Sequence, residues 1–100
     1  MITINHSPGR ISIEGHAGYA PLGRDIVCAA VSTVVQTFLA SVEELTTDKI
    51  KSDIAAGNVV IEYGTLTAEG QTLLASFFVG IRMIADGYPE YVKLTEHSRH

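Results

Sequence analysis

The sequence has a single cysteine and only four histidines, and this limits the kinds of catalytic and metal-binding site that it can form. The cysteine is Cys28, and His16 is the only histidine away from the two ends of the chain. A lone cysteine cannot form an internal disulfide, which is typical of a reducing compartment and leaves the thiol free to react. Without a second internal Cys or His, a redox pair or metal centre is disfavoured, and we expect no metal and no cofactor.

Basic residues and long apolar runs are also scarce. Seven Lys and Arg stand against eleven Asp and Glu, for a net charge of -4, and the basic residues are scattered. This argues against a nucleic-acid partner, because binding to a phosphate backbone needs clustered positive charge. The first residues contain no basic leader and no unbroken apolar run, and no stretch of the chain is expected to reach the roughly 18 residues that a membrane span needs. We therefore expect a cytoplasmic protein with no membrane partner.

The chain also lacks linkers, low-complexity tracts and repeats. Its 100 residues are 46% apolar, which is typical of a folded chain, so residues 1–100 are predicted to form one domain. A domain of this size buries only about two-thirds of its unfolded surface. Its core is therefore small, and this favours a partner subunit.

Two kinds of apolar spacing run through the chain. Alternation predicts strands at 2–5, 11–14, 50–54, 59–63 and 91–94, and Ser7-Pro8-Gly9 and Ala56-Gly57-Asn58 supply turns. The last strand is expected at a sheet edge. Steps of three and four predict helices at 25–45 and from Thr67 to Gly87. The order is strand-strand-helix-strand-strand-helix-strand. This favours an α+β two-layer sandwich, a mostly antiparallel sheet with both helices packed on one face.

The first helix is the more unusual of the two. Its beginning, from Ile26 to Val31, is apolar all round, which predicts burial on more than one side, against the sheet and against a second subunit. We therefore expect a homodimer.

The strongest candidate for chemistry is the start of this helix. With Asp25 as the N-cap, Cys28 falls in the first turn, where unpaired N–H groups and the helix dipole favour a thiolate. His16, at the end of a predicted strand, is the candidate base, and the N–H groups of Val27 and Cys28 are candidate oxyanion donors. Asp25 either caps the helix or orients His16. A plain alternative is that Cys28 is a small core residue and His16 a surface residue.

The residues Gly15-His16-Ala17, followed by Gly23 and by Asp25-Ile26-Val27-Cys28-Ala29-Ala30-Val31-Ser32, resemble the ribosomal-processing cysteine proteases of bacteria. The resemblance joins a G-H-A turn, a G-x-D-I-V-C-A-A-x-S helix start and the interval between His and Cys. It covers about 18 residues closely. Length and element order agree with the same family.

This resemblance implies a homodimeric endopeptidase that removes an amino-terminal extension from the twenty-seventh large-subunit ribosomal protein. Cys28 would be the nucleophile, His16 the general base and acid, and Asp25 and Ser32 supporting residues. The loop from Ala17 to Arg24, with Gly18, Tyr19 and Gly23, would be a mobile flap over the substrate. The paired aromatic residues of the family's substrate imply an apolar groove near this flap.

Two alternatives stay open at this point. Similar phage enzymes trim capsid or scaffold proteins, and nothing after Thr47 identifies a ribosomal substrate. The chain could also be a non-catalytic dimeric interaction module. The pair His97 and His100 could touch a metal, although a frayed tail is the favoured interpretation.

Overall fold

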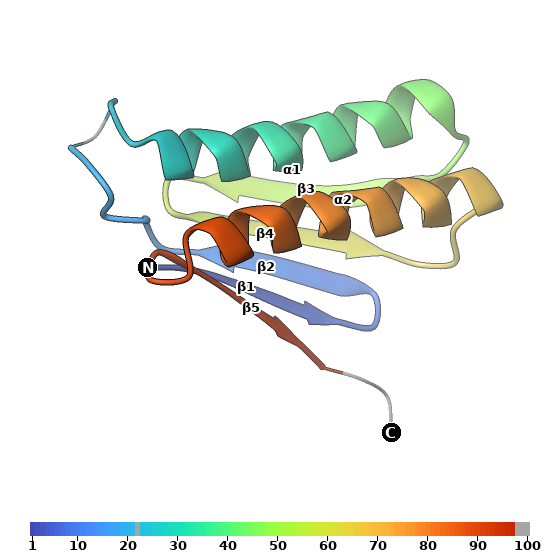
Figure 1. The fold of residues 1–100 in the computed structure, drawn as a ribbon. Coiled ribbons are helices and arrows are strands. Elements are labelled where there is room, and N and C mark those ends of the chain that lie inside the picture. The colour runs from blue at the N-terminus through green and yellow to red at the C-terminus, as the bar shows by residue number, and fades with distance from the viewer. Residues whose placement is uncertain (22, 98–100) are drawn as a thin grey trace.

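The computed structural model describes residues 1–21 and 23–97, which form a sheet covered on one face by two helices (Figure 1). The elements are β1 (Ile2–Ser7), β2 (Arg10–Glu14), α1 (Ile26–Leu45), β3 (Ile50–Ala55), β4 (Asn58–Tyr63), α2 (Ala68–Gly87) and β5 (Val92–Glu96). The predicted order and two-layer α+β class are confirmed. The strands of the two hairpins extend one or two residues beyond the predicted bounds, because the turns are tighter than expected. Strand β5 begins one residue later and ends two residues later than predicted.

The five strands lie in the order β3-β4-β2-β1-β5. All neighbours are antiparallel except β1 and β5, which are parallel with Ile2 opposite Val92. The predicted edge position of the last strand is confirmed. Both hairpins turn through two residues and use glycine in the left-handed region, Gly9 at φ +79° and Gly57 at φ +72°. Other residues adopt that conformation only at a cost.

The core lies between the sheet and the helices. Ile4, Ile11 and Ile61 from three neighbouring strands are fully buried, together with Val27 of α1 and Ile81 of α2. Strand residues that alternate with them, such as Thr3 and Ser12, lie on the face that no helix covers. Burial on one face of each strand is therefore what the alternating sequence pattern encodes.

Helix α1 buries one face only within this chain. Val27, Val31, Val35, Phe38 and Val42 are buried, whereas Ile26 is 54% exposed. The expected burial of this helix on more than one side is thus not found within the chain, because its second apolar side has nothing of this chain to contact.

The expectation that no stretch is long enough to span a membrane is wrong. By length and composition, the 20 residues of α1 could cross one. Scattered polar residues interrupt the apolar run of α1, but they lower its mean hydropathy only a little. A search for an unbroken apolar run therefore misses this helix. A core helix meets the same criterion, and the buried face of α1 contacts the sheet and α2 here.

The second helix begins at a hydrogen-bonded cap, as predicted. The hydroxyl of Thr67 accepts a hydrogen bond from the N–H of Gly70 at 3.1 Å, and Asp48 accepts from both the N–H and the hydroxyl of Thr67. These hydrogen bonds hold the pKa of Asp48 below its usual value. Asp48 follows the end of α1, so one carboxylate links the end of the first helix to the start of the second.

His6 is half-buried at the end of β1 that is remote from His16. Its ring stacks on Phe78 with centroids 4.2 Å apart, and its Nε2 lies 2.8 Å from the hydroxyl of Tyr63. Burial lowers the pKa of His6, and the nearby Glu96 carboxylate partly opposes this effect. The neutral imidazole is therefore the form that fits the folded protein.

Stability should fall as the pH drops below about 6.5, the pKa of an unperturbed histidine. Because the pKa of His6 is lower in the folded state, the unfolded chain takes up the proton first and folding is penalised. Urea unfolding midpoints at pH 7.5 and pH 5 should differ more for the wild type than for His6→Gln. Equal differences in the two proteins would contradict this assignment, since both contain the same carboxylates.

Candidate active site

The side chain of Asp25 determines how α1 begins. Its Oδ1 accepts hydrogen bonds from the N–H groups of Val27 at 3.0 Å and Cys28 at 2.9 Å. Its Oδ2 accepts from the N–H of Tyr19 in the preceding loop at 3.0 Å. The bond from Cys28 is the largest of several backbone hydrogen bonds that lower the pKa of Asp25. Of the two roles open for this residue, the structure supports the helix cap.

This capping corrects the expected oxyanion site. The N–H groups of Val27 and Cys28 are both occupied by Asp25, so neither is available to a substrate oxygen in this conformation. A different donor reaches the thiol: the N–H of Ala17 lies 3.3 Å from Cys28 Sγ. Ala17 is itself buried, with 3% of its surface exposed. The backbone next to His16 therefore contacts the sulfur directly.

His16 follows the end of β2 and lies over the turn between β3 and β4. A Cβ atom added at Gly57 would sit 2.9 Å from His16 Nε2, so the ring rests against the glycine backbone. The N–H of Gly15 donates to the carbonyl of Gly57 at 2.9 Å, which fixes the same turn to the residue before His16. The amino group of Met1 donates to the His16 carbonyl at 2.6 Å. Backbone on both sides thus holds this exposed histidine.

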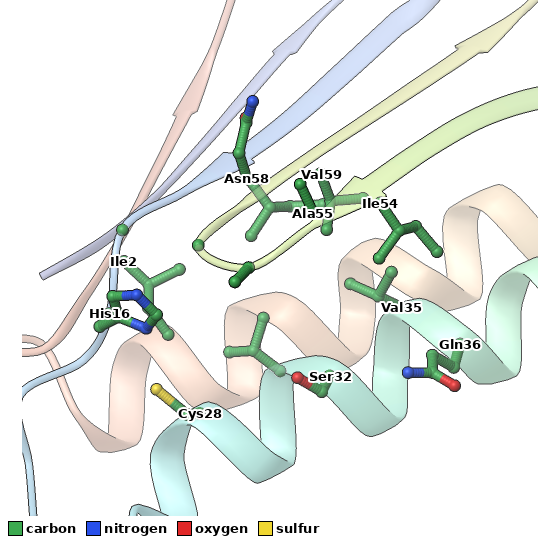
Figure 2. A pocket seen from close by; sticks show the side chains of 15 residues that line it. Ile2, His16, Cys28, Ser32, Val35, Gln36, Ile54, Ala55, Asn58 and Val59 are labelled. Carbon is green, nitrogen blue, oxygen red and sulfur yellow. The ribbon is translucent and has the colours of Figure 1, made fainter. Parts of the chain in front are cut away.

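Cys28 and His16 line the same end of one pocket of about 290 Å³ (Figure 2). The pocket lies between the first half of α1 and the hairpin of β3 and β4. Its apolar side chains come from both layers: Ile2, Ile13, Val31, Val35, Ile54 and Val59. Ser32, one turn after Cys28, is exposed and lines the pocket as well. The pocket can thus take an apolar side chain beside a thiol and an imidazole.

No hydrogen bond joins His16 to Cys28 within the described residues. The thiol is instead paired with Ala17 N–H, and the imidazole lies beside it at the pocket's end. In free enzymes the contacts that carry catalysis are often longer than in the complex with substrate. The arrangement is therefore compatible with proton transfer once a substrate fills the pocket.

The loop from Ala17 to Arg24 extends away from this pocket in the structure. None of its described residues lines the pocket. Tyr19 makes edge contacts with Tyr88 and Tyr91, with ring centroids 5.7 and 5.2 Å apart. Gly18 and Gly23 have positive φ, and the space around each is open. Tyr19 is thus held both by these aromatic contacts and by the hydrogen bond from its N–H to Asp25.

The remaining sequence candidates lie elsewhere. His97 continues the pairing of β1 and β5 through its N–H, 2.7 Å from the carbonyl of His6. Its predicted partner His100 lies outside the described residues. Over residues 1–21 and 23–97, no three His, Cys, Asp or Glu side chains gather in a way that could hold a metal ion.

The sequence did not predict the contacts of two residues near the site, Ala17 and Gly57. Ala17 looked like a loop residue, and Gly57 like one of several turn glycines. Their roles depend on contacts between segments 11 and 41 residues apart, Ala17 with Cys28 and Gly57 with His16. The position of Ala17 in the G-H-A turn was the only available signal for either.

Comparisons with known proteins agree with this geometry. A family model described as cysteine protease Prp matches residues 1–93. The ribosomal processing cysteine protease Prp of Mycoplasma genitalium is 31% identical, and the match covers 98% of this chain and 98% of that protein. The protein of the same name from Staphylococcus aureus is 30% identical over 93% of this chain and 92% of its own length.

A solved structure shares the fold. A crystal structure of the ribosomal processing protease Prp from S. aureus, in complex with a covalently linked product peptide, superposes with a TM-score of 0.92. It is 24% identical, and the match covers 97% of this chain and all of that one. The family match spans nearly the whole sequence, including the Cys28 pocket. This chain belongs to the Prp family of cysteine proteases.

Proposed function

We propose that this protease removes an amino-terminal extension from the twenty-seventh large-subunit ribosomal protein, with Cys28 as nucleophile and His16 as general base. The observation that carries the proposal is the shared pocket, in which thiol and imidazole lie at the same end of an apolar cavity. The name of its relatives, ribosomal processing cysteine protease, supports the substrate. The protein would act in the cytoplasm, where ribosomes are assembled.

The proposed reaction has two halves. His16 takes the thiol proton, and the Cys28 sulfur attacks the scissile carbonyl carbon and forms a tetrahedral intermediate. The carbon–nitrogen bond then breaks as His16 returns the proton to the leaving amine, which leaves a thioester. Water, deprotonated by His16, attacks the thioester and releases the second product with the free thiol. No cofactor takes part in either half.

The surrounding residues have distinct proposed roles. The Ala17 N–H, already bonded to the sulfur, stabilises negative charge at this end of the pocket. Asp25 keeps Cys28 in the first turn of α1, and Ser32 offers a hydroxyl to the bound peptide from one turn further on. The loop with Gly18, Tyr19 and Gly23 would close over the substrate as a flap, for which the Tyr19 contacts must be released.

The sequence left open other functions and another substrate. Membership of a protease family sets aside the non-catalytic interaction module and the redox centre. A phage capsid or scaffold substrate has no specific observation in its favour here. It would replace the ribosomal substrate if the protein cut such a precursor and left the ribosomal one intact.

The homodimer remains part of the proposal. Helix α1 leaves Ile26 54% exposed, and α2 leaves Met83 71% exposed and Val79 50% exposed. Burying such side chains against a second copy would stabilise a protein whose own core is small.

Cys28→Ala and His16→Ala should both abolish cleavage of the ribosomal precursor, because each removes one half of the proton transfer. Mass spectrometry of the products after mixing each protein with the purified precursor measures this. The precursor should be shortened by the wild type only. Cleavage by Cys28→Ala would rule out the proposed nucleophile.

Gly57→Ala should lower kcat by about tenfold or more, because the new Cβ displaces the His16 ring. The matched control is Gly9→Ala in the other hairpin, at a similar φ of +79°. Both substitutions should cost at least about 1 kcal/mol of stability through backbone strain. Gly9→Ala should cost somewhat more, because its Cβ would lie 3.1 Å from the carbonyl oxygen of Tyr63, but only Gly57→Ala should reduce kcat. Equal kcat values in the two variants would refute a role for Gly57 in positioning His16.

Sedimentation velocity at micromolar concentration should give the mass of two chains, that is twice 10.7 kDa. Met83→Glu, which adds charge to an exposed apolar position, should shift the protein toward the single-chain mass if α2 contributes to the interface. A wild-type protein of single-chain mass would contradict the dimer.

A further inference from the structure

The free edge of β3 has unpaired backbone groups at alternate residues. Strand β3 lies at one end of the sheet, so only β4 pairs with it. In β4, Tyr63 donates to Gly9 and Gly57 accepts from Gly15, so the odd-numbered residues of this strand bond toward β2. The even-numbered residues Asn58, Val60 and Glu62 therefore bond toward β3, opposite Ala55, Asp53 and Lys51. The N–H and C=O groups of Ile50, Ser52 and Ile54 are left pointing outward from the sheet.

The same three residues border the hollows beside α1. Ile54 lines the pocket that holds Cys28 and His16. Ile50 and Ser52 line a neighbouring hollow of about 260 Å³, together with Leu39, Val42 and Thr46 near the end of α1. One strand edge thus runs beside two hollows that follow each other along the helix, beginning at the thiol.

This edge has only part of the protection that sheet edges often have. Strand β3 carries two charged side chains, Lys51 and Asp53, but it contains no proline. All of its residues except Ile50 are exposed, and Ile54 is 55% exposed. An uncovered strand of this kind readily accepts another extended chain. The opposite edge of the sheet, β5, lies four strands away and does not border the Cys28 pocket.

We propose that β3 binds the substrate by adding it to the sheet as a sixth strand, an inference that rests on the protease function proposed above. The occupant is an extended peptide whose main chain bonds to Ile50, Ser52 and Ile54. Six residues of strand span about 20 Å, so about six substrate residues would be held along the groove. Main-chain pairing supplies affinity, and side chains at every second position enter the apolar pocket and supply specificity.

Amide hydrogen exchange of the Cys28→Ala protein tests this directly, because the variant binds without cutting. The probe is a 15-residue peptide that spans the extension and first residues of the ribosomal precursor. At saturation, the amides of Ser52 and Ile54 should exchange at least about tenfold more slowly than in the free protein. The amide of Leu94, in β5 at the other edge, should be unchanged. Unchanged Ser52 and Ile54 amides in the complex would overturn the inference.

Backbone N-methylation of the peptide gives a second readout that leaves the protein intact. Methylation at every second residue should weaken binding about three- to tenfold, the value of a net hydrogen bond, whereas the intervening positions should tolerate it. Loss of affinity without this alternation would exclude strand addition.

Further outcomes separate this inference from the proposed function and from self-association. Cleavage by the wild type without Ser52 and Ile54 protection would leave the protease function standing and refute the sixth strand. Protection of Ser52 and Ile54 without cleavage by the wild type would support the sixth strand and refute the proposed function. Protection in the free protein that grows with its concentration would assign the edge to a second copy of this chain and refute the substrate assignment.

Discussion

One carboxylate, that of Asp25, holds together the start of α1 and the loop that precedes it. It accepts hydrogen bonds from Val27 and Cys28 in the helix and from Tyr19 in the loop. The first turn of any helix has N–H groups without internal partners, and a capping side chain commonly contributes about 1 kcal/mol by satisfying them. Here the cap also determines where the thiol lies, because Cys28 is the third residue of the helix.

The cap has a chemical consequence as well. A negative charge beside the helix N-terminus offsets part of the positive potential that would favour a thiolate. The Ala17 N–H contributes in the opposite direction, since it points at the sulfur from 3.3 Å. The helix start is therefore organised by Asp25, while the electrostatic support for the sulfur comes from the G-H-A turn. These two contributions come from different segments, one after the end of β2 and one at the start of α1.

The sheet supplies the other half of the site. His16 lies two residues after the end of β2, and the turn after β3 lies under its ring. Gly57 is the residue that allows this approach, because any Cβ there would meet Nε2. The same hairpin borders the pocket with Ile54 and Val59. Catalysis and substrate binding, as proposed, thus share one short hairpin, and a change in its turn would affect both.

Local patterns were enough to predict most of this protein. Alternating apolar residues placed the five strands, spacing of three and four placed both helices, and Asp25 and Thr67 marked their starts, because each signal depends only on neighbours in sequence. The motif around His16 and Cys28 indicated the family. Tertiary structure decided the rest: that Asp25 occupies the N–H groups expected for an oxyanion, that Ala17 reaches the sulfur, that Gly57 supports the imidazole, and that β3 has a free edge beside the pocket. Each of these depends on which distant segments meet, and that is set by how sheet and helices bury their apolar faces together, which no local pattern encodes.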